Sequence, residues 1–382
     1  MKVTIAIDSL KGSLTSMEAG EAIRAGVLAA DPSADVCVRP LADGGEGTAD
    51  ALILGMGGRE EHVTVTGPLG DAVDCMYGIV EKSHTAIIEM SGAAGITLIP
   101  ASARNPLATT TYGVGEVIRD AINKGCRRFV VGLGGSVTND AGVGMLQALG
   151  FQFLDENGQQ VPGGAAGLAQ VRRVDVDHAM PELEECSFRV ACDVTNPLCG
   201  ELGCSAVFGP QKGATPQMVA DMDGWIADLA ALVKGVLPQS DPDFPGSGAA
   251  GGMGYAMCTF LGAELESGID IVLDETRLAD YVAGADVVVT GEGRLDAQTV
   301  MGKAPSGVAN LAKEHDATVI AFAGSVTEDA VACNQHGIDA FFPILRGVCT
   351  LDEAMDPANA AHNMTATAEQ AFRLFVAARA RA

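Results

Sequence analysis

The sequence predicts an α/β protein in which both ends of the chain form one discontinuous parallel-sheet domain, with a mixed α/β domain inserted between them. Three observations predict this fold class. Short apolar β-branched runs alternate with helical patterns at both ends, the middle of the chain carries antiparallel patterns, and glycine-rich loops follow the strands. A chain of 382 residues has room for roughly two to three domains.

Two strand patterns and two helix patterns alternate at the N-terminal end. Residues 3–7 and 36–40 are predicted strands, and residues 16–30 and 48–56 are predicted helices. The first helix begins at a capping box, in which Thr15 and Glu18 satisfy each other's backbone N–H groups.

The C-terminal end repeats this alternation, whereas the middle of the chain differs. The C-terminal strands are predicted at 286–289, 319–323 and 340–342, and the helices at 308–314, near Asp329 and at 365–380. In the middle, residues 60–89 alternate as antiparallel strands do, and residues 151–161 predict a hairpin that turns at Asn157-Gly158. A long amphipathic helix begins at Thr215-Pro216. The expected boundaries are therefore 1–66 with 281–382 for the parallel-sheet domain, and 67–280 for the insertion.

Composition and charge exclude several classes of protein. The chain has 24 Lys and Arg against 49 Asp and Glu, a net charge of −25, which argues against nucleic acid or an anionic membrane as partner. No apolar run is long enough to cross a bilayer, and no signal-peptide core is expected at the N-terminus. The ten cysteines lie mostly in apolar runs, as in reduced proteins. We therefore expect a globular cytoplasmic protein.

Glycine clusters follow the predicted strands. In the terminal domain they come after Ile7, Pro40, Val289 and Ala323, and in the insertion a similar cluster covers residues 132–140. The carboxyl ends of parallel strands meet at one edge of a sheet, so the four terminal loops are expected to line one crevice. Because glycine has no side chain, the backbone N–H groups of these loops can approach an anion closely. We therefore expect the loops to bind phosphate.

Lysines and carboxylates in these loops indicate what the crevice does. Of eight lysines, Lys11, Lys212 and Lys303 lie in loops between elements, where an acidic protein needs cations to hold an anionic ligand. Carboxylates that suit Mg²⁺ or proton abstraction share the loops; they are Asp8, Asp43, Glu46, Asp140, Asp193, Glu292 and Asp296. Glycine, lysine and carboxylate together indicate phosphoryl transfer.

The sequence does not support a P-loop, a dinucleotide-binding motif, a zinc site or a histidine base. No P-loop pattern is complete, because Ala297 and Ala304 stand at two of its required positions. The literal dinucleotide pattern at 246–251 follows a proline-rich loop rather than a strand, no C-x-x-C pair occurs, and the six histidines lie far apart. A zinc site and a histidine base are therefore not supported.

Seven motifs resemble the bacterial two-domain glycerate kinase family. They are DSLKGS at 8–13, ADGGEGT at 42–48, GLGGSVTND at 132–140, DVTNPL at 193–198, VFGPQKG at 207–213, GAAGG at 248–252, and TGEG at 290–293 with Asp296 and Gln298-Thr299. They occur in order along residues 3–325, and the one departure is Leu10, where the family more often has Phe.

The resemblance implies transfer of the ATP γ-phosphoryl group to a hydroxyl of D-glycerate with Mg²⁺, usually the 2-hydroxyl. It also implies a Rossmann-like domain with the active site in a cleft between it and the inserted domain. The resemblance is compatible with a homo-oligomer.

Roles for single residues come from their types and places in the chain. Asp193 ends a strand-like run and is the expected general base, with Asp43 next and Lys11 as a catalytic cation; an Asx-turn role for Asp193 stays open. Glu292 and Asp296 are expected metal ligands, with capping of the next helix as their alternative. The expected binding residues are Asp8, Ser13, Gly44, Gly45, Gly134, Gly135, Ser136, Asn139, Asn196, Lys212, Gly291, Gly293 and Lys303.

Two other functions compete with a kinase. A non-catalytic phosphate-binding regulator would keep the glycine loops but has no need of the Mg²⁺ carboxylates. A hydrolase using Asp43 and Asp193 has no need of three loop lysines. ADP production that depends on D-glycerate distinguishes the kinase from both.

Overall fold

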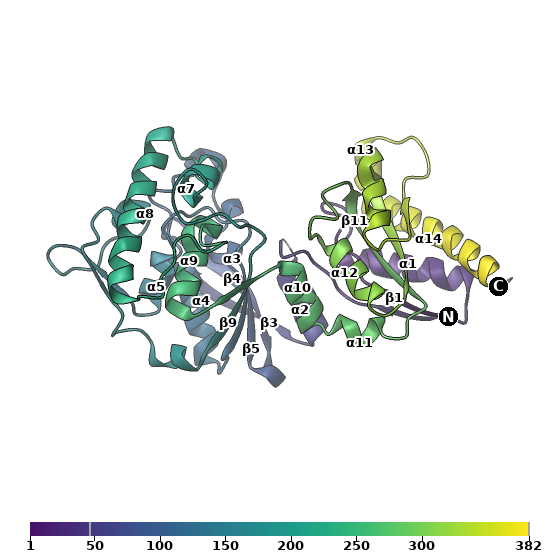
Figure 1. The fold of residues 1–382 in the computed structure, drawn as a ribbon, viewed down its shortest axis with the longest axis horizontal. Coiled ribbons are helices and arrows are strands. Elements are labelled where there is room, and N and C mark those ends of the chain that lie inside the picture. The colour runs from purple at the N-terminus through teal and green to yellow at the C-terminus, as the bar shows by residue number, and fades with distance from the viewer. Residues whose placement is uncertain (46, 381–382) are drawn as a thin grey trace. The chain divides into compact units, whose positions relative to one another are not determined.

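The computed structural model describes residues 1–45 and 47–380, which form two compact units (Figure 1). The first, here called the terminal unit, comprises residues 1–43, 50–56 and the chain from residue 269 onward. The second, the inserted unit, comprises residues 44–49 and 57–268.

The terminal unit is built on a five-stranded parallel sheet with the order β13-β12-β11-β1-β2. Val3 pairs with Val287 on one side and with Val36 on the other, so the first strand joins the two ends of the chain. The predicted discontinuous Rossmann-like sheet is confirmed. The strands are β1 (Lys2–Ile5), β2 (Asp35–Val38), β11 (Val287–Leu295), β12 (Thr318–Val326) and β13 (Ala340–Pro343).

Helices α1 (Ser16–Ala30) and α14 (Pro357–Arg379) lie side by side in the terminal unit, as Figure 1 shows, and share a buried core with the sheet. Helix α12 (Ala304–Lys313) packs against β11 and β12. The predicted capping box of α1 is present, because Thr15 and Glu18 exchange hydrogen bonds. The remaining helices are α2 (Thr48–Met56), α10 (Gly268–Glu275), α11 (Leu278–Val282) and α13 (Leu351–Met355), with a 3₁₀ segment at Glu328–Gln335.

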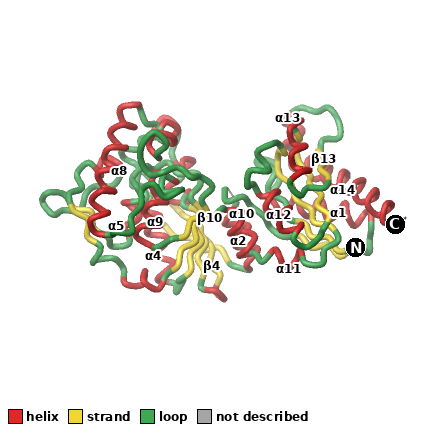
Figure 2. The backbone as a smooth tube through the Cα atoms, in the orientation of Figure 1, coloured by secondary structure: helices red, strands yellow, loops and turns green. Residues whose placement is uncertain are grey.

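The inserted unit contains a mixed six-stranded sheet with the order β10-β9-β6-β5-β4-β3, visible in yellow in Figure 2. Its first four strands are parallel, and β4 and β3 extend it as an antiparallel hairpin. The strands are β3 (Arg59–Thr66), β4 (Ala72–Val80), β5 (Thr85–Glu89), β6 (Arg128–Gly132), β9 (Ser187–Ala191) and β10 (Glu264–Glu266), and a separate pair is formed by β7 (Gln152–Leu154) and β8 (Arg173–Asp175).

One large apolar core holds the helices of the inserted unit to its sheet. The predicted helix at Thr215-Pro216 is α8, and Met222, Ile226 and Val233 of its apolar stripe are buried. The helices are α3 (Ser91–Ala94), α4 (Tyr112–Asn123), α5 (Val143–Ala148), α6 (Ala165–Leu168), α7 (Cys204–Phe208), α8 (Pro216–Val236) and α9 (Ala249–Leu261).

Some element boundaries differ from the expectation. Strand β3 pairs with β4, so residues 59–66 belong to the inserted unit, and residues 269–280 belong to the terminal unit. The expected hairpin at 151–161 is present as a short turn, in which the Asp155 N–H donates to the Gln159 carbonyl and the Val161 N–H to the Phe153 carbonyl. Strand β7 also pairs with β8, which the sequence did not predict. Helix α14 begins eight residues earlier than predicted, at an Asp356 cap followed by Pro357.

No helix within residues 1–45 and 47–380 combines the length and the apolar character needed to cross a membrane.

The crossing of α1 and α14 yields a stability prediction. A Cβ on Gly26 would meet the Thr365 carbonyl and lie 2.8 Å from the Ala368 Cβ, so Gly26→Ala should lower the free energy of unfolding by about 1–3 kcal/mol. Gly224 in α8 has open space around it, so Gly224→Ala should raise that free energy by about 0.5–1 kcal/mol through helix propensity alone. Urea denaturation of both variants checks this; changes of the same sign would contradict it.

Candidate functional site

A cavity of about 500 Å³ lies in the terminal unit, where the parallel strands end. Asp8 follows β1, Asp43 follows β2, Gly293 lies at the end of β11, and Gly324 and Ser325 lie near the end of β12. Loops that are distant in sequence therefore meet because their strands are parallel neighbours. The sequence-predicted site residues that line this cavity are Asp8, Lys11, Ser13, Asp43, Glu292, Gly293, Asp296 and Lys303.

The terminal cavity concentrates carboxylates. Asp8 is only 5% exposed, and burial, reinforced by the nearby charge of Asp43, raises its pKa to about 7. Its Oδ1 accepts a hydrogen bond from the Ser9 backbone N–H at 2.7 Å. Burial also raises the pKa of Glu292. The site thus holds buried acids whose ionised forms are disfavoured.

Cations and a hydroxyl accompany these carboxylates. Lys11 Nζ lies 3.7 Å from an Asp43 oxygen, and Lys303 Nζ lies 3.6 Å from a Glu292 oxygen. The Thr299 hydroxyl donates to Glu292 at 2.6 Å. Each lysine contact is longer than a hydrogen bond, so both ammonium groups can turn toward a bound anion.

Asp296 does not cap the next helix, because α12 begins at Ala304 with Lys303 as its N-cap. Its Oδ1 accepts from the Gln298 backbone N–H at 2.9 Å, which is an Asx turn, and its Oδ2 lies 3.6 Å from Arg294 Nε. One carboxylate can make these bonds and still present a lone pair to the cavity that it lines.

The chemistry of the terminal cavity fits Mg²⁺ bound together with a nucleotide. The described part of the chain contains no group of three or more His, Cys, Asp or Glu side chains placed to hold a metal by themselves. Mg²⁺ usually takes one or two carboxylates and completes its shell with water and substrate phosphates. A divalent cation would also stabilise the ionised form of Asp8, whose pKa is raised by burial and, to a lesser extent, by the charge of Asp43.

Sequence reasoning missed the apolar wall of the terminal cavity. Ile344 and Leu345 follow β13, and Leu351 and Met355 belong to α13. Two signals could have found them. The rule that loops at strand ends line the site applies to β13 as well, and Thr350 with Glu353 forms a capping box that starts α13.

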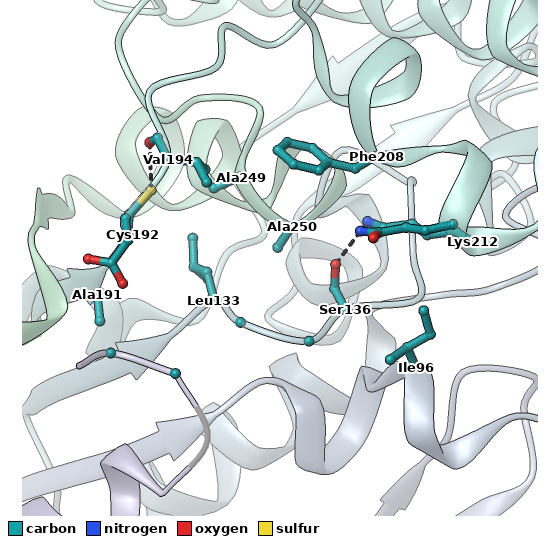
Figure 3. A pocket seen from close by; sticks show the side chains of 16 residues that line it. Ile96, Leu133, Ser136, Ala191, Cys192, Val194, Phe208, Lys212, Ala249 and Ala250 are labelled. Carbon is teal, nitrogen blue, oxygen red and sulfur yellow. Dashed lines mark hydrogen bonds between the residues drawn. The ribbon is translucent and has the colours of Figure 1, made fainter. Parts of the chain in front are cut away.

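A second cavity, of about 420 Å³, lies within the inserted unit at the ends of β6 and β9 (Figure 3). Ile96, Leu133, Phe208 and Ala249 supply apolar surface. Leu133, Phe208 and Ala249 lie in the motifs quoted above, whereas sequence reasoning missed Ile96. The sequence-predicted site residues that line it are Gly44, Gly45, Gly134, Gly135, Ser136, Asp193 and Lys212.

Lys212 is the buried cation of this cavity. Its side chain is 1% exposed, and its Nζ donates to the Ser136 hydroxyl at 2.9 Å and to the Thr138 carbonyl at 2.6 Å. Figure 3 shows Lys212 and Ser136 pointing toward each other across one end of the cavity. Burial lowers the pKa of Lys212 to about 8.

Asp193 follows β9 and is exposed. Its Oδ1 accepts from the Gly268 backbone N–H at 3.0 Å, and its Oδ2 lies 2.6 Å from where a Cβ on Gly44 would stand. Gly44 also has a φ of +96°, so this position requires glycine on two counts. The hydrogen bond from Gly268 therefore orients the carboxylate, and a side chain at position 44 would displace it.

Three of the expected binding residues line neither cavity. Asn139 is fully buried and its amide donates to the Ser205 hydroxyl, while the Asn196 amide donates to the Leu202 carbonyl. Gly291 is in the sheet, where a Cβ would meet the Phe322 carbonyl oxygen. Asp140 is also buried, and its carboxylate accepts hydrogen bonds from the loop at Thr111 and the start of α5. Glu46 lies outside the described residues.

The raised pKa of Asp8 predicts a specific pH dependence of stability. Between an unfolded pKa of about 4 and a folded pKa of about 7, the folded state holds more protons than the unfolded state, so stability falls as pH rises through this window. Asp8→Asn removes the ionisation, and its stability relative to the wild type should rise by on the order of 2–4 kcal/mol between pH 4 and pH 8.

Denaturation in Mg²⁺-free buffer at several pH values measures this difference. Asp228→Asn is the control, because Asp228 is an exposed side chain of α8. A stability difference for Asp8→Asn that stays constant across the window would show that Asp8 is not a buried acid.

Comparison with known proteins identifies the family. The model of the "Glycerate kinase family" matches residues 3–376. The chain is 46% identical to a glycerate 2-kinase of Escherichia coli K12, over 96% of this chain and 98% of that protein, and 46% identical to a glycerate kinase of Bacillus subtilis 168, over 96% of each. A crystal structure described as glycerate kinase 2 from Salmonella typhimurium LT2 superposes with a TM-score of 0.91 at 45% identity, covering 99% of both chains. The chain therefore belongs to the glycerate kinase family.

Proposed function

We propose that this protein transfers the γ-phosphoryl group of ATP to the 2-hydroxyl of D-glycerate, producing 2-phosphoglycerate and ADP in the cytoplasm. The observation that carries the proposal is the set of lysines and buried carboxylates at the strand ends of the terminal unit, in a chain whose close relatives are named glycerate kinases. Positioned cations and carboxylates are what phosphoryl transfer requires of a protein.

The terminal cavity is proposed as the nucleotide site. Glu292 and Asp296 would hold Mg²⁺, which when bound neutralises charge on the phosphates. Lys11 and Lys303 would turn from Asp43 and Glu292 toward the phosphates. The apolar wall formed by residues of α13 and the chain after β13 suits the face of a nucleobase.

Asp193 is proposed as the general base. As the 2-hydroxyl oxygen forms its bond to the γ-phosphorus, the bond from that phosphorus to the bridging oxygen of ADP breaks, and the hydroxyl proton passes to the Asp193 carboxylate. The Gly268 N–H binds one Asp193 oxygen and so orients the carboxylate, which lines the cavity at the end of β9. Asp43 and Asp8 are the alternatives, and a pKa of about 7 suits Asp8 to proton transfer at neutral pH.

The product distinguishes the two possible acceptors. The purified enzyme should release ADP only when D-glycerate is present. Proton-coupled phosphorus NMR should show the product signal as a doublet, because the phosphate of 2-phosphoglycerate is attached to a CH carbon. A triplet would place the phosphate on the CH₂ carbon and refute transfer to the 2-hydroxyl, and ADP release without glycerate would indicate a hydrolase.

Substitution of Asp193 tests the proposed base. Asp193→Asn should lower kcat by about 10²–10⁴ while the binding of D-glycerate and ATP is retained. Asp228→Asn is the matched control and should change neither. If Asp193→Asn loses binding and turns over bound substrate at a near-normal rate, Asp193 is a positioning residue and the base is Asp43 or Asp8.

A further inference from the structure

The buried cation in the inserted unit forms no ion pair with any residue that the structure describes. Among residues 1–45 and 47–380, no carboxylate lies within ion-pair distance of Lys212, whose two hydrogen bonds go to a neutral hydroxyl and a neutral carbonyl. The titratable groups that face it are Cys204 of α7 and Asp140. Burial raises the pKa of Cys204 to about 11, so the thiol is neutral. Asp140 attracts Lys212 from beyond ion-pair distance, but burial outweighs this attraction and lowers the pKa of Lys212.

Burial of an ammonium group without an ion-pair partner lowers the free energy of unfolding. Removing such a charge from water costs several kcal/mol unless an opposite charge approaches it. The local backbone nevertheless fixes Lys212 in place, because Pro210–Lys212 forms a 3₁₀ turn that ends at Gly213 with a φ of +94°. The turn therefore holds a charge that the described protein groups do not neutralise.

Donor protons remain at the Lys212–Ser136 pair. An ammonium carries three protons, and Lys212 donates to two acceptors. The Ser136 oxygen accepts from Lys212, so the Ser136 hydroxyl proton is left to donate elsewhere. Ser136 is 7% exposed and lines the cavity with Lys212. Two donors thus adjoin one cavity wall.

The adjoining glycine backbone keeps this end of the cavity open. A Cβ on Gly134 would meet no atom closer than 3.9 Å, and the residue has no positive φ. Neither packing nor backbone geometry therefore requires glycine at position 134. A side chain there would occupy space beside Ser136, where a ligand could approach the backbone.

We propose that Lys212 and Ser136 form an oxyanion subsite, which binds either a phosphate group of the nucleotide or the carboxylate of glycerate. The inference rests on the proposed kinase function for the identity of the ligand. Phosphate and carboxylate share the relevant chemistry, namely oxygen atoms that accept hydrogen bonds from an ammonium and a hydroxyl. Binding supplies the missing counter-charge, so occupancy of the subsite is coupled to protonation of Lys212.

Calorimetric binding of ADP, D-glycerate and inorganic phosphate to the full-length protein tests the subsite. Lys212→Met should weaken one of the two substrates by about 10² or more, and Ser136→Ala should weaken the same substrate by about tenfold. The affected ligand identifies the source: ADP and inorganic phosphate for a phosphate subsite, D-glycerate for a carboxylate subsite. Lys82→Met, which removes an exposed lysine of the same unit, should change nothing.

Proton uptake provides a readout that needs no variant to fold. With a pKa of about 8 in the free protein, Lys212 is mostly neutral at pH 8.5, so anion binding should take up as much as about three-quarters of a proton there. At pH 6.5 Lys212 is already protonated and contributes almost no uptake, and proton exchange measured there with ADP or inorganic phosphate belongs to the phosphate group, whose second pKa is about 6. Calorimetry in buffers of different ionisation enthalpy measures this uptake on the wild type. Phosphate-free buffers keep the site available to the probes.

Unchanged affinities in both variants, or the absence of proton uptake at pH 8.5 with all three probes, would overturn the subsite. Failure of the proposed kinase function gives a different experimental result from failure of the subsite. A protein that still converts ATP to ADP at the normal rate in the presence of D-glycerate after Lys212→Met lacks the subsite but remains a kinase. A protein that binds phosphate with proton uptake and phosphorylates no glycerate keeps the subsite and refutes the function.

Discussion

The parallel pairing of β1 with β11 is the constraint on which the terminal cavity depends. Val3 and Val287 are buried partners from opposite ends of the chain, and the Asp8 N–H donates to the Gly291 carbonyl at 3.0 Å just beyond the paired strands. Residues that follow the two strands must therefore emerge side by side. This places Asp8 and Glu292 in one cavity, and their burial there raises the pKa of both.

The two cavities bury groups of opposite charge, carboxylates in the terminal cavity and a lysine in the inserted unit. The terminal cavity gathers carboxylates whose repulsion a cation would relieve, whereas the inserted cavity buries a lysine that an anion would neutralise. In a chain of net charge −25, such local arrangements are necessary to bind anionic substrates at all. Under the proposed function, a bound Mg²⁺–nucleotide or hydroxy acid would compensate these charges.

The glycines in the site loops have different physical roles. Gly291 is required by the sheet, because the Phe322 carbonyl occupies the place of a side chain, and Gly44 is required by its φ and by Asp193. Gly134 and Gly293 have neither constraint, since a Cβ at either would meet no atom closer than 3.8 Å. Their lack of a side chain instead leaves backbone accessible from the cavities that they line. A glycine-rich motif thus mixes structural and ligand-facing positions.

Local and periodic features could be predicted from the sequence by itself. Hydrogen bonding between neighbouring residues predicts the capped starts of α1 and α8. Repeated apolar spacing predicts the α/β class and the parallel strands at both chain ends. Strand-end loops also indicated most residues that line the two cavities, because parallel topology determines which ends meet.

Only the tertiary structure decided which of those loop residues line a cavity, which are buried away from it, and what surrounds each one. Nothing local distinguishes Asn139, whose amide is buried against Ser205, from Ser136, which faces a cavity three residues earlier. The pKa of Asp8 and the contact of Lys212 with Ser136 likewise arise between residues far apart in the chain. Burial, desolvation and pairing across long sequence separations depend on the assembled core, and a linear pattern does not contain them.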